Sequence, residues 1–304
     1  MKGLVYKSTG SWYQVKDIEG RFLKARIKGV FKNEGLTSTN PIAVGDEVVI
    51  EMENELESGA MITEITDRRN YITRSSPHNR HQHHIIASNL DQCLLFATLK
   101  DPKTSTGFID RFLITAEAYH IPAIVVFNKA DLYRKKEEER FLEVRDMYEK
   151  AGYKVISASV ERKTGLEEIG KMLKDKITLL SGHSGVGKSS FINTLFPELK
   201  LRTQDVSDWS GKGLHTTTFA EMFDLPVGGK IIDTPGIREL GLVDISKQEL
   251  SHYYPEMRLL INQCRFNNCL HSNEQQCAVK DAVEEGRVHI DRYVSYRTIL
   301  DSIE

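Results

Sequence analysis

The most constraining feature of the sequence is a glycine-rich segment that fits the pattern G-x-x-x-x-G-K-[ST]. It follows the apolar residues 177–180 and precedes a helical pattern over 188–195, and these flanks argue against a chance glycine-rich turn. In such loops backbone N–H groups surround the β-phosphate of a nucleotide, the lysine contacts the β- and γ-phosphates, and the serine ligates Mg²⁺. The expected nucleotide-binding residues are Gly182, His183, Ser184, Gly185, Val186, Gly187, Lys188, Ser189 and Ser190.

A second motif predicts which base is bound. Asn128, Lys129, Ala130 and Asp131 follow the apolar run 121–127 and therefore lie at the carboxyl end of an expected strand. A carboxylate there accepts hydrogen bonds from N1–H and the exocyclic amine of guanine, whereas adenine has an acceptor at N1 and no 2-amino group. Buried polar groups left unpaired by the wrong base make such selection strong.

Three further segments resemble the other loops of guanine-nucleotide-binding proteins. Ser157 and Ala158 begin an S-A-S sequence typical of a loop whose backbone N–H reaches guanine O6. The sequence D-T-P-G at 233–236 predicts that Asp233 holds Mg²⁺ through water and that the Gly236 amide contacts the γ-phosphate. The glycine-rich segment 211–218 contains Thr216, Thr217 and Thr218, and we favour Thr217 as the switch ligand of Mg²⁺.

The order of these motifs is circularly permuted. In a Ras-like chain the phosphate loop comes first and N-K-x-D comes late, whereas here N-K-A-D and S-A-S precede the phosphate loop. Strand-like and helix-like segments alternate over residues 85–243, which predicts a doubly wound α/β sheet that binds ligands at the carboxyl ends of its strands. The permutation places the segment after D-T-P-G directly before the C-terminal region.

The N-terminal 68 residues predict a small β-barrel. Five short strand-like segments, at about 3–6, 12–16, 21–27, 47–52 and 59–65, fit an OB-fold. Residues 1–32 hold eight Lys and Arg against two acids, whereas residues 33–67 hold nine acids and no Lys or Arg. This asymmetry is compatible with an RNA-binding face, with a protein-binding module and with an ordinary solvated surface.

Residues 69–84 are expected to form a basic linker. Together with Arg68, they contain four Arg and four His without an acid or a periodic apolar pattern. We favour contact with RNA over plain solvation, and a metal site formed by His78, His81, His83 and His84 ranks behind both.

Three of the four cysteines cluster in the expected C-terminal region, residues 244–304. Cys264, Cys269, His271 and Cys277 offer three thiolates and one imidazole within fourteen residues, which matches a closed structural zinc site. The alternative is that these cysteines are buried core residues. Helical segments are expected over 279–299 with an interruption near Gly286.

Composition excludes several classes of protein. With 41 Lys and Arg against 43 Asp and Glu the net charge is −2, so any polyanion must contact local patches. The hydrophobic fraction of 40% is that of a globular protein, and the longest apolar run is far shorter than a membrane span. Because the N-terminal sequence lacks the apolar core of a secretory signal, we expect a cytoplasmic protein without membrane contact.

Taken together, the motifs identify a resemblance that covers essentially the whole chain. The permuted N-K-A-D, S-A-S, GHSGVGKSS, GKGLHTTT and DTPGIRELGL segments, the Cys/His cluster and the RYVSY run at 292–296 resemble the small ribosomal subunit biogenesis GTPase RsgA (YjeQ/YloQ) family. The resemblance implies an OB-fold, a permuted GTPase domain and a zinc domain. It also implies GTP/GDP, Mg²⁺ and one Zn²⁺ as ligands. The expected partners are the small ribosomal subunit and its RNA, with hydrolysis stimulated by that subunit. We expect a monomer.

The catalytic group is the least constrained by sequence. Ile237 follows D-T-P-G and cannot orient a water molecule as the usual Gln does. His215, in the glycine-rich segment, can donate and accept protons near neutral pH and is a candidate for this task, beside Lys188 and Thr217. An equally supported alternative is that His215 contacts RNA or phosphate.

Three other functions fit parts of the sequence. A phosphate loop also serves ATPases and kinases, but N-K-A-D argues against adenine. An RNA-binding scaffold with a structural nucleotide would retain the same motifs, and only turnover distinguishes it. A signalling GTPase would leave the barrel and the zinc cluster without a task.

Overall fold

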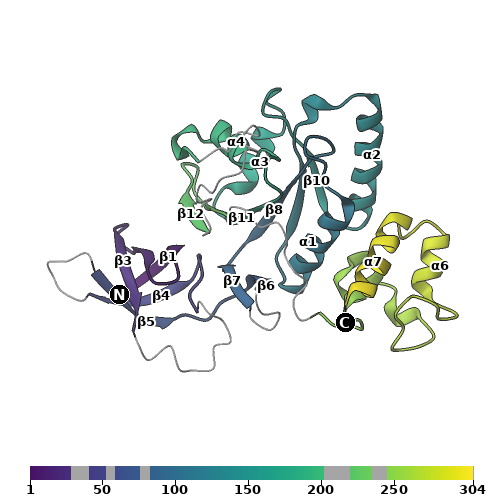
Figure 1. Ribbon diagram of the computed structural model, residues 1–304, viewed down its shortest axis with the longest axis horizontal. Coiled ribbons are helices and arrows are strands. Elements are labelled where there is room, and N and C mark those ends of the chain that lie inside the picture. Colours follow the sequence, from purple (N-terminus) through teal and green to yellow (C-terminus); the bar gives the residue numbers. More distant parts are fainter. Residues whose placement is uncertain (29–40, 53–58, 76–82, 202–219, 235–244, 304) are drawn as a thin grey trace, which may run out of the picture.

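The computed structural model describes residues 1–28, 41–52, 59–75, 83–201, 220–234 and 245–303. Figure 1 shows a β-barrel, an α/β sheet and a group of C-terminal helices. In the described part of the chain, no helix is long and apolar enough to cross a membrane.

The N-terminal barrel is closed and has the five expected strands. They are β1 (Lys2–Ser8), β2 (Tyr13–Asp17), β3 (Phe22–Ile27), β4 (Glu47–Met52) and β5 (Gly59–Ile65). Pairing runs β1–β2–β3–β5–β4 and returns to β1, and only the β3–β5 pair is parallel. Alternate side chains of each strand fill the interior, which confirms the OB-fold prediction.

The segment expected to be a basic linker contains two strands. β6 (Tyr71–Ser75) and β7 (His83–Ser88) pair antiparallel, so the segment 69–84 that connects the barrel to the α/β region includes strand residues that the sequence did not predict. The hairpin lies between the barrel and the α/β sheet (Figure 1). Val44 of the barrel region bridges to Ala87, and the hydroxyl groups of Thr73 and Tyr119 are 2.6 Å apart.

The α/β region follows the alternation expected from the sequence. Its elements are β8 (Gln92–Ala97), α1 (Thr106–Ala118), β9 (Ala123–Phe127), α2 (Lys135–Lys150), β10 (Lys154–Ser157), α3 (Leu166–Leu173), β11 (Ile177–Ser181), α4 (Lys188–Leu195), β12 (Glu221–Asp224) and β13 (Lys230–Asp233). The strand order is β10–β9–β8–β11–β13–β12, and every pair is parallel except β13–β12.

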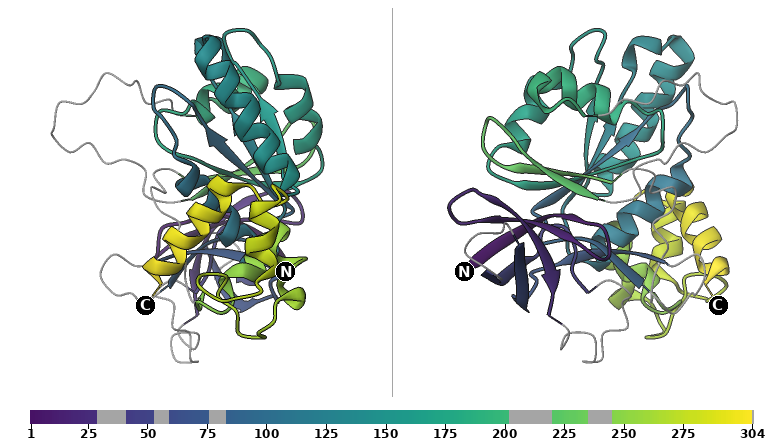
Figure 2. Two further views of the ribbon diagram at one scale, coloured as in Figure 1. Left: turned by 90° about the vertical axis from the view of Figure 1, so that its right-hand side faces the viewer. Right: turned by 60° about the vertical axis from the view of Figure 1, so that its left-hand side comes forward.

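Helices cover both faces of this sheet (Figure 2). One apolar core contains Phe112 of α1 and Val144 of α2, and the other contains Ile169 of α3 and Phe191 of α4. Burial on both faces explains why β8 is a continuous apolar run without alternation. The doubly wound prediction is therefore confirmed.

The barrel joins the α/β sheet edge to edge. Lys7 of β1 pairs with Glu221 of β12, so the two sheets form one eleven-stranded sheet. At the same junction Tyr6 Oη donates to Asp224 at 2.6 Å, and Lys16 Nζ lies 2.6 Å from the same carboxylate. The junction thus combines backbone pairing with ion pairs.

The C-terminal region is helical, as expected. Its elements are the short helical turns η4 (Leu250–Tyr253) and η5 (Ile261–Gln263) and the helices α5 (Pro255–Arg258), α6 (Ala278–Glu284) and α7 (Ile290–Ser302). Gly286, with a φ of 74°, lies between α6 and α7 at the expected interruption.

Candidate nucleotide and metal sites

The predicted phosphate loop connects β11 to α4, in the strand–loop–helix setting that the sequence requires. Gly182 has a φ of +135°, and a Cβ there would lie 2.2 Å from the carbonyl oxygen of Phe96 on β8. Gly187, with a φ of +87°, starts α4, and its Cβ would lie 2.6 Å from Asn128 Nδ2. Only glycine fits at either position, so the loop lies tightly against its neighbours.

Lys188 is folded against this loop. Its Nζ donates to the carbonyl oxygens of Gly182 and His183 at 2.7 and 3.0 Å. Burial lowers the pKa of Lys188, and the Asp233 carboxylate opposes that shift. A desolvated ammonium group beside a glycine-rich loop is the arrangement that binds phosphate oxygens. Ser189 is half-buried in the first turn of α4, whereas Ser184 and Ser190 are exposed.

The guanine motif contacts the phosphate loop directly. Asn128 is 1% exposed, and its Nδ2 donates to the carbonyl oxygen of Val186 at 2.8 Å. Two segments that are 58 residues apart in the sequence are therefore fixed to one another by a buried hydrogen bond. The backbone of Lys129 has a φ of +62°, which turns the chain at the end of β9.

Asp131 and the S-A-S segment lie together. Ser159 Oγ donates to Asp131 Oδ1, and the N–H of Ala130 donates to the carbonyl of Ala158 at 3.0 Å. Ser157 ends β10, and the N–H of Ala158 donates to the carbonyl of Phe127 at 2.8 Å, so this amide is engaged within the sheet. The contact from Ser159 orients the carboxylate expected to select guanine.

Asp233 lies at the carboxyl end of β13, beside β11 and the phosphate loop. Burial raises its pKa, and the positive charge of Lys188 opposes that shift. Its Oδ1 is buried and has no hydrogen-bond partner among the residues that the structure describes. A buried carboxylate oxygen without a partner, close to a lysine and a phosphate loop, fits a group that contacts hydrated Mg²⁺.

His215, Thr217 and Gly236 lie outside the described residues, as does Ile237. The switch and catalytic roles assigned to them remain predictions from the sequence.

One contact of the phosphate loop was not foreseen. The His183 imidazole stacks on the Phe108 ring of α1, with ring centroids 3.8 Å apart and an interplanar angle of 30°. Burial lowers the pKa of His183, and nearby Lys188 acts in the same direction. The sequence offered only a histidine at the second position of the motif, without a signal for its partner.

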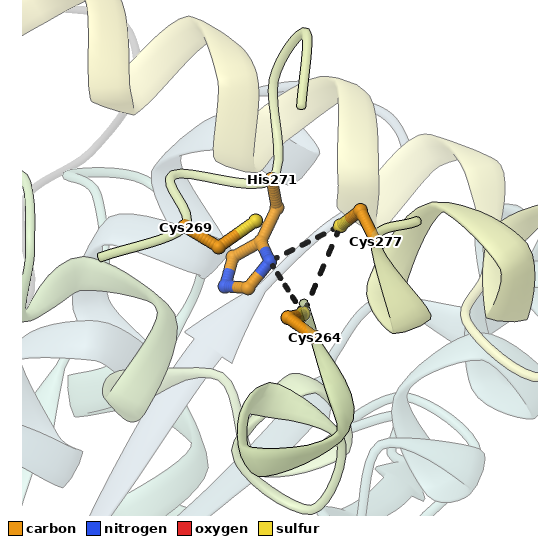
Figure 3. Close-up of side chains that lie close together, drawn as sticks. All are labelled: Cys264, Cys269, His271 and Cys277. Atoms are coloured by element: carbon orange, nitrogen blue, oxygen red, sulfur yellow. Dashed lines mark hydrogen bonds between the residues drawn. The ribbon is translucent and has the colours of Figure 1, made fainter. Parts of the chain in front are cut away.

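The four predicted metal ligands lie together (Figure 3). Cys264 follows η5, Cys277 immediately precedes α6, and Cys269 and His271 lie in the loop between these elements. The four ligand atoms are all within 4.8 Å of one another. His271 Nδ1 is 3.6 Å from Cys264 Sγ and 3.3 Å from Cys277 Sγ, and these two sulfur atoms are 4.0 Å apart.

These distances fit a tetrahedral metal. Ligands at the usual zinc–sulfur and zinc–nitrogen distances lie about 3.5–3.8 Å from one another. Burial raises the pKa of the Cys269 thiol to about 12, so a thiolate there needs a neighbouring cation. Tyr293 Oη and Tyr296 Oη of α7 donate to the carbonyls of His271 and Leu270, respectively. These hydrogen bonds fix the loop that carries the metal ligands to α7. The donor set therefore fits one structural Zn²⁺.

The fold and the nucleotide site define a circularly permuted P-loop GTPase. The model of the RsgA GTPase family matches residues 65–243, and that of the RsgA N-terminal domain matches residues 2–60. The chain therefore belongs to the RsgA GTPase family. As a member of this family it is a GTP hydrolase.

Curated relatives resemble this chain over nearly its whole length. "Small ribosomal subunit biogenesis GTPase RsgA" of Cytophaga hutchinsonii is 53% identical over 300 residues, which cover 99% of this chain and 98% of the relative. The protein with the same name from Flavobacterium psychrophilum is 51% identical over 302 residues, covering 99% and 93%.

Two solved structures share the fold. YjeQ from Thermotoga maritima superposes with a TM-score of 0.80 at 33% identity and covers 99% of this chain and 98% of its own. YloQ, described as a circularly permuted GTPase, superposes with a TM-score of 0.74 at 28% identity, covering 99% and 94%.

Proposed function

We propose that this protein binds the small ribosomal subunit late in its assembly and hydrolyses GTP there, and that the bound subunit stimulates hydrolysis. The observation that carries the nucleotide assignment is the buried hydrogen bond from Asn128 to Val186, which joins the guanine motif to the phosphate loop. The names of the curated relatives support the assignment to small-subunit biogenesis.

Each predicted residue has a task in this proposal. Asp131 selects guanine in GTP or GDP, and Lys188 binds the β- and γ-phosphates. Ser189 and Thr217 ligate Mg²⁺, and Asp233 contacts that ion through water. His215 orients the attacking water, because the hydrophobic Ile237 stands where Ras-like proteins have Gln.

The barrel offers a surface suited to RNA. Lys24 Nζ lies 4.0 Å and the Arg26 guanidinium carbon 3.8 Å from the ring centroid of Trp12. Both cations are on exposed positions of β3, beside the half-buried ring of Trp12 in the loop between β1 and β2. Positive charge together with an aromatic face suits phosphate contact and base stacking. In our proposal this face, the basic segment 69–84 and the zinc domain bind ribosomal RNA.

The proposal divides the chain into an OB-fold domain (1–68), a basic connecting segment (69–84), a GTPase domain (85–243) and a zinc-binding domain with one Zn²⁺ (244–304). The protein acts as a monomer in the cytoplasm, where small subunits are assembled.

The direct test is GTP hydrolysis by the purified protein alone and with purified small subunits. ATP and large subunits serve as controls. We expect stimulation only with GTP and small subunits together. Slow hydrolysis in every mixture, with GTP binding and subunit binding intact, would instead indicate an RNA-binding scaffold with a structural nucleotide.

Two substitutions test individual residues. Asp131→Asn replaces one hydrogen-bond acceptor with a donor that faces a donor on guanine, so GTP affinity should fall about 100-fold or more. Asp146→Asn, on the exposed face of α2, is the matched control. His215→Ala should abolish subunit-stimulated hydrolysis while GTP binding remains, and hydrolysis at the wild-type rate would refute its role.

A further inference from the structure

Three charged residues form a row across the junction between the barrel and the α/β sheet. Lys7 of β1 lies opposite Glu221 of β12, and Glu221 lies opposite Asp233 of β13. Both strand pairs are antiparallel, and residues directly opposite one another in such pairs point to the same face of the sheet. The barrel thus places Lys7 directly opposite Glu221, whose other neighbour across the strands is Asp233.

Two of the three charged groups in this row form an ion pair with one another. Lys7 Nζ is 2.9 Å from Glu221 Oε2, and both side chains are about one-third exposed, at 32% and 31%. The Oδ1 atom of Asp233 is buried, and no group in the described part of the chain forms a hydrogen bond with it. Because Glu221 and Asp233 lie directly opposite one another in an antiparallel strand pair, Glu221 is close enough to act on Asp233 electrostatically.

We propose that Glu221 is a positioning residue of the magnesium site, and that Lys7 of the barrel sets its effect by neutralising its charge. This inference rests on the proposed function, which assigns Asp233 to Mg²⁺. With the barrel docked, the Lys7–Glu221 pair adds little net charge beside Asp233. When Lys7 is removed or the barrel moves away, the uncompensated carboxylate strengthens the attraction for a divalent cation.

The size of the effect follows from charge and distance. Opposed residues have Cβ atoms about 5 Å apart, which places the Glu221 carboxylate on the order of 7 Å from an ion held at Asp233. A unit charge at that distance from a divalent ion, in an environment close to water and screened by salt, changes its affinity about fivefold.

A double-mutant cycle in the full-length protein tests the inference. The probe is fluorescently labelled GDP, and its dissociation rate is measured as a function of free Mg²⁺. Lys7→Met should lower the Mg²⁺ concentration needed for half-maximal retention about fivefold, because Glu221 is left uncompensated. Glu221→Gln should raise it by a similar factor, because Lys7 then remains alone. The double variant should return close to wild type.

Lys16→Met is the matched control. It removes a second ion pair of the same junction, with Asp224, but Asp224 lies opposite Lys230 rather than beside Asp233. We expect no change in Mg²⁺ dependence. Shifts of the same sign in both single variants, or a Lys16→Met shift equal to that of Lys7→Met, would overturn the inference and indicate a role in docking alone. Mg²⁺-independent GDP retention by the wild type would overturn the proposed magnesium site as well.

Discussion

Arg292 is the residue whose replacement should most weaken the attachment of the C-terminal helices. Its side chain is 1% exposed and lies between Asp110 of α1, also 1% exposed, and Glu256 of α5, 7% exposed. It donates three hydrogen bonds, one to Asp110 Oδ1 at 2.5 Å and two to the Glu256 carboxylate at 2.7 and 3.2 Å. Its guanidinium carbon is also 4.4 Å from the ring centroid of Tyr254.

Arg292→Met keeps much of the side-chain volume but leaves two carboxylates buried without their cation. Removing one partner of a buried ion pair typically costs about 3–5 kcal/mol, because desolvation of the remaining charge is no longer offset. Since each 1.4 kcal/mol is a factor of ten, amide hydrogen exchange in α1 and α7 should accelerate by about two to four orders of magnitude.

Arg140→Met is the control for this measurement. Arg140 of α2 also contacts α7, through Asp291 at 3.3 Å, but the two side chains are 43% and 42% exposed. Such exposed pairs contribute less than about 1 kcal/mol, so exchange should change by less than about fivefold. If Arg292→Met accelerated exchange no more than Arg140→Met does, the buried cluster would not hold the C-terminal helices as described.

Three further predictions concern the other sites. Gly187→Ala should weaken GDP binding at least about tenfold in calorimetric titration, because the new Cβ would lie 2.6 Å from Asn128 Nδ2 at a backbone φ of +87°; unchanged affinity would contradict the tight loop packing. Cys277→Ser should lower the zinc content from one ion per chain to near zero, measured by elemental mass spectrometry, because the site would lose one of its three thiolates. Asp224 is partly buried, which raises its pKa, but hydrogen bonds from a barrel lysine and tyrosine outweigh this and leave the pKa lowered. A carboxylate whose folded pKa is lowered stabilises the protein above its unfolded pKa and loses this contribution as pH falls through the folded value. Urea unfolding should therefore show that the stability advantage of wild type over Asp224→Asn at pH 6 shrinks below about pH 4. An advantage as large at pH 3 as at pH 6 would contradict this coupling.

The nucleotide motifs and the metal ligands could be found from the sequence because each is local. The phosphate loop needs only its glycines, its lysine and its two flanking elements, all of which are contiguous in the chain. The four metal ligands lie within fourteen residues, so a single loop brings them together. The barrel strands and the α/β alternation were likewise evident from the spacing of apolar residues.

The β6–β7 hairpin was missed because its segment is rich in arginine and histidine. Its strands lack the regular apolar alternation that predicts a half-buried strand, and a register irregularity separates Ile72 from Thr73. Pairing with one another and contacts to the barrel and α1 stabilise these strands, and such contacts leave no local pattern.

Contacts between residues far apart in the chain could be seen only in the folded protein. Arg292 is 182 residues from Asp110 in the sequence, and Lys7 is 214 residues from Glu221. A single charged residue is expected to lie on the surface. When it is buried instead, the residues next to it in the sequence do not reveal which oppositely charged residue pairs with it. Local residue patterns were therefore enough to predict the chemistry of the nucleotide and metal sites. The packing of the barrel and the C-terminal helices against the α/β sheet decided how those sites are connected, because non-local ion pairs form only once strand order and helix docking bring their partners together.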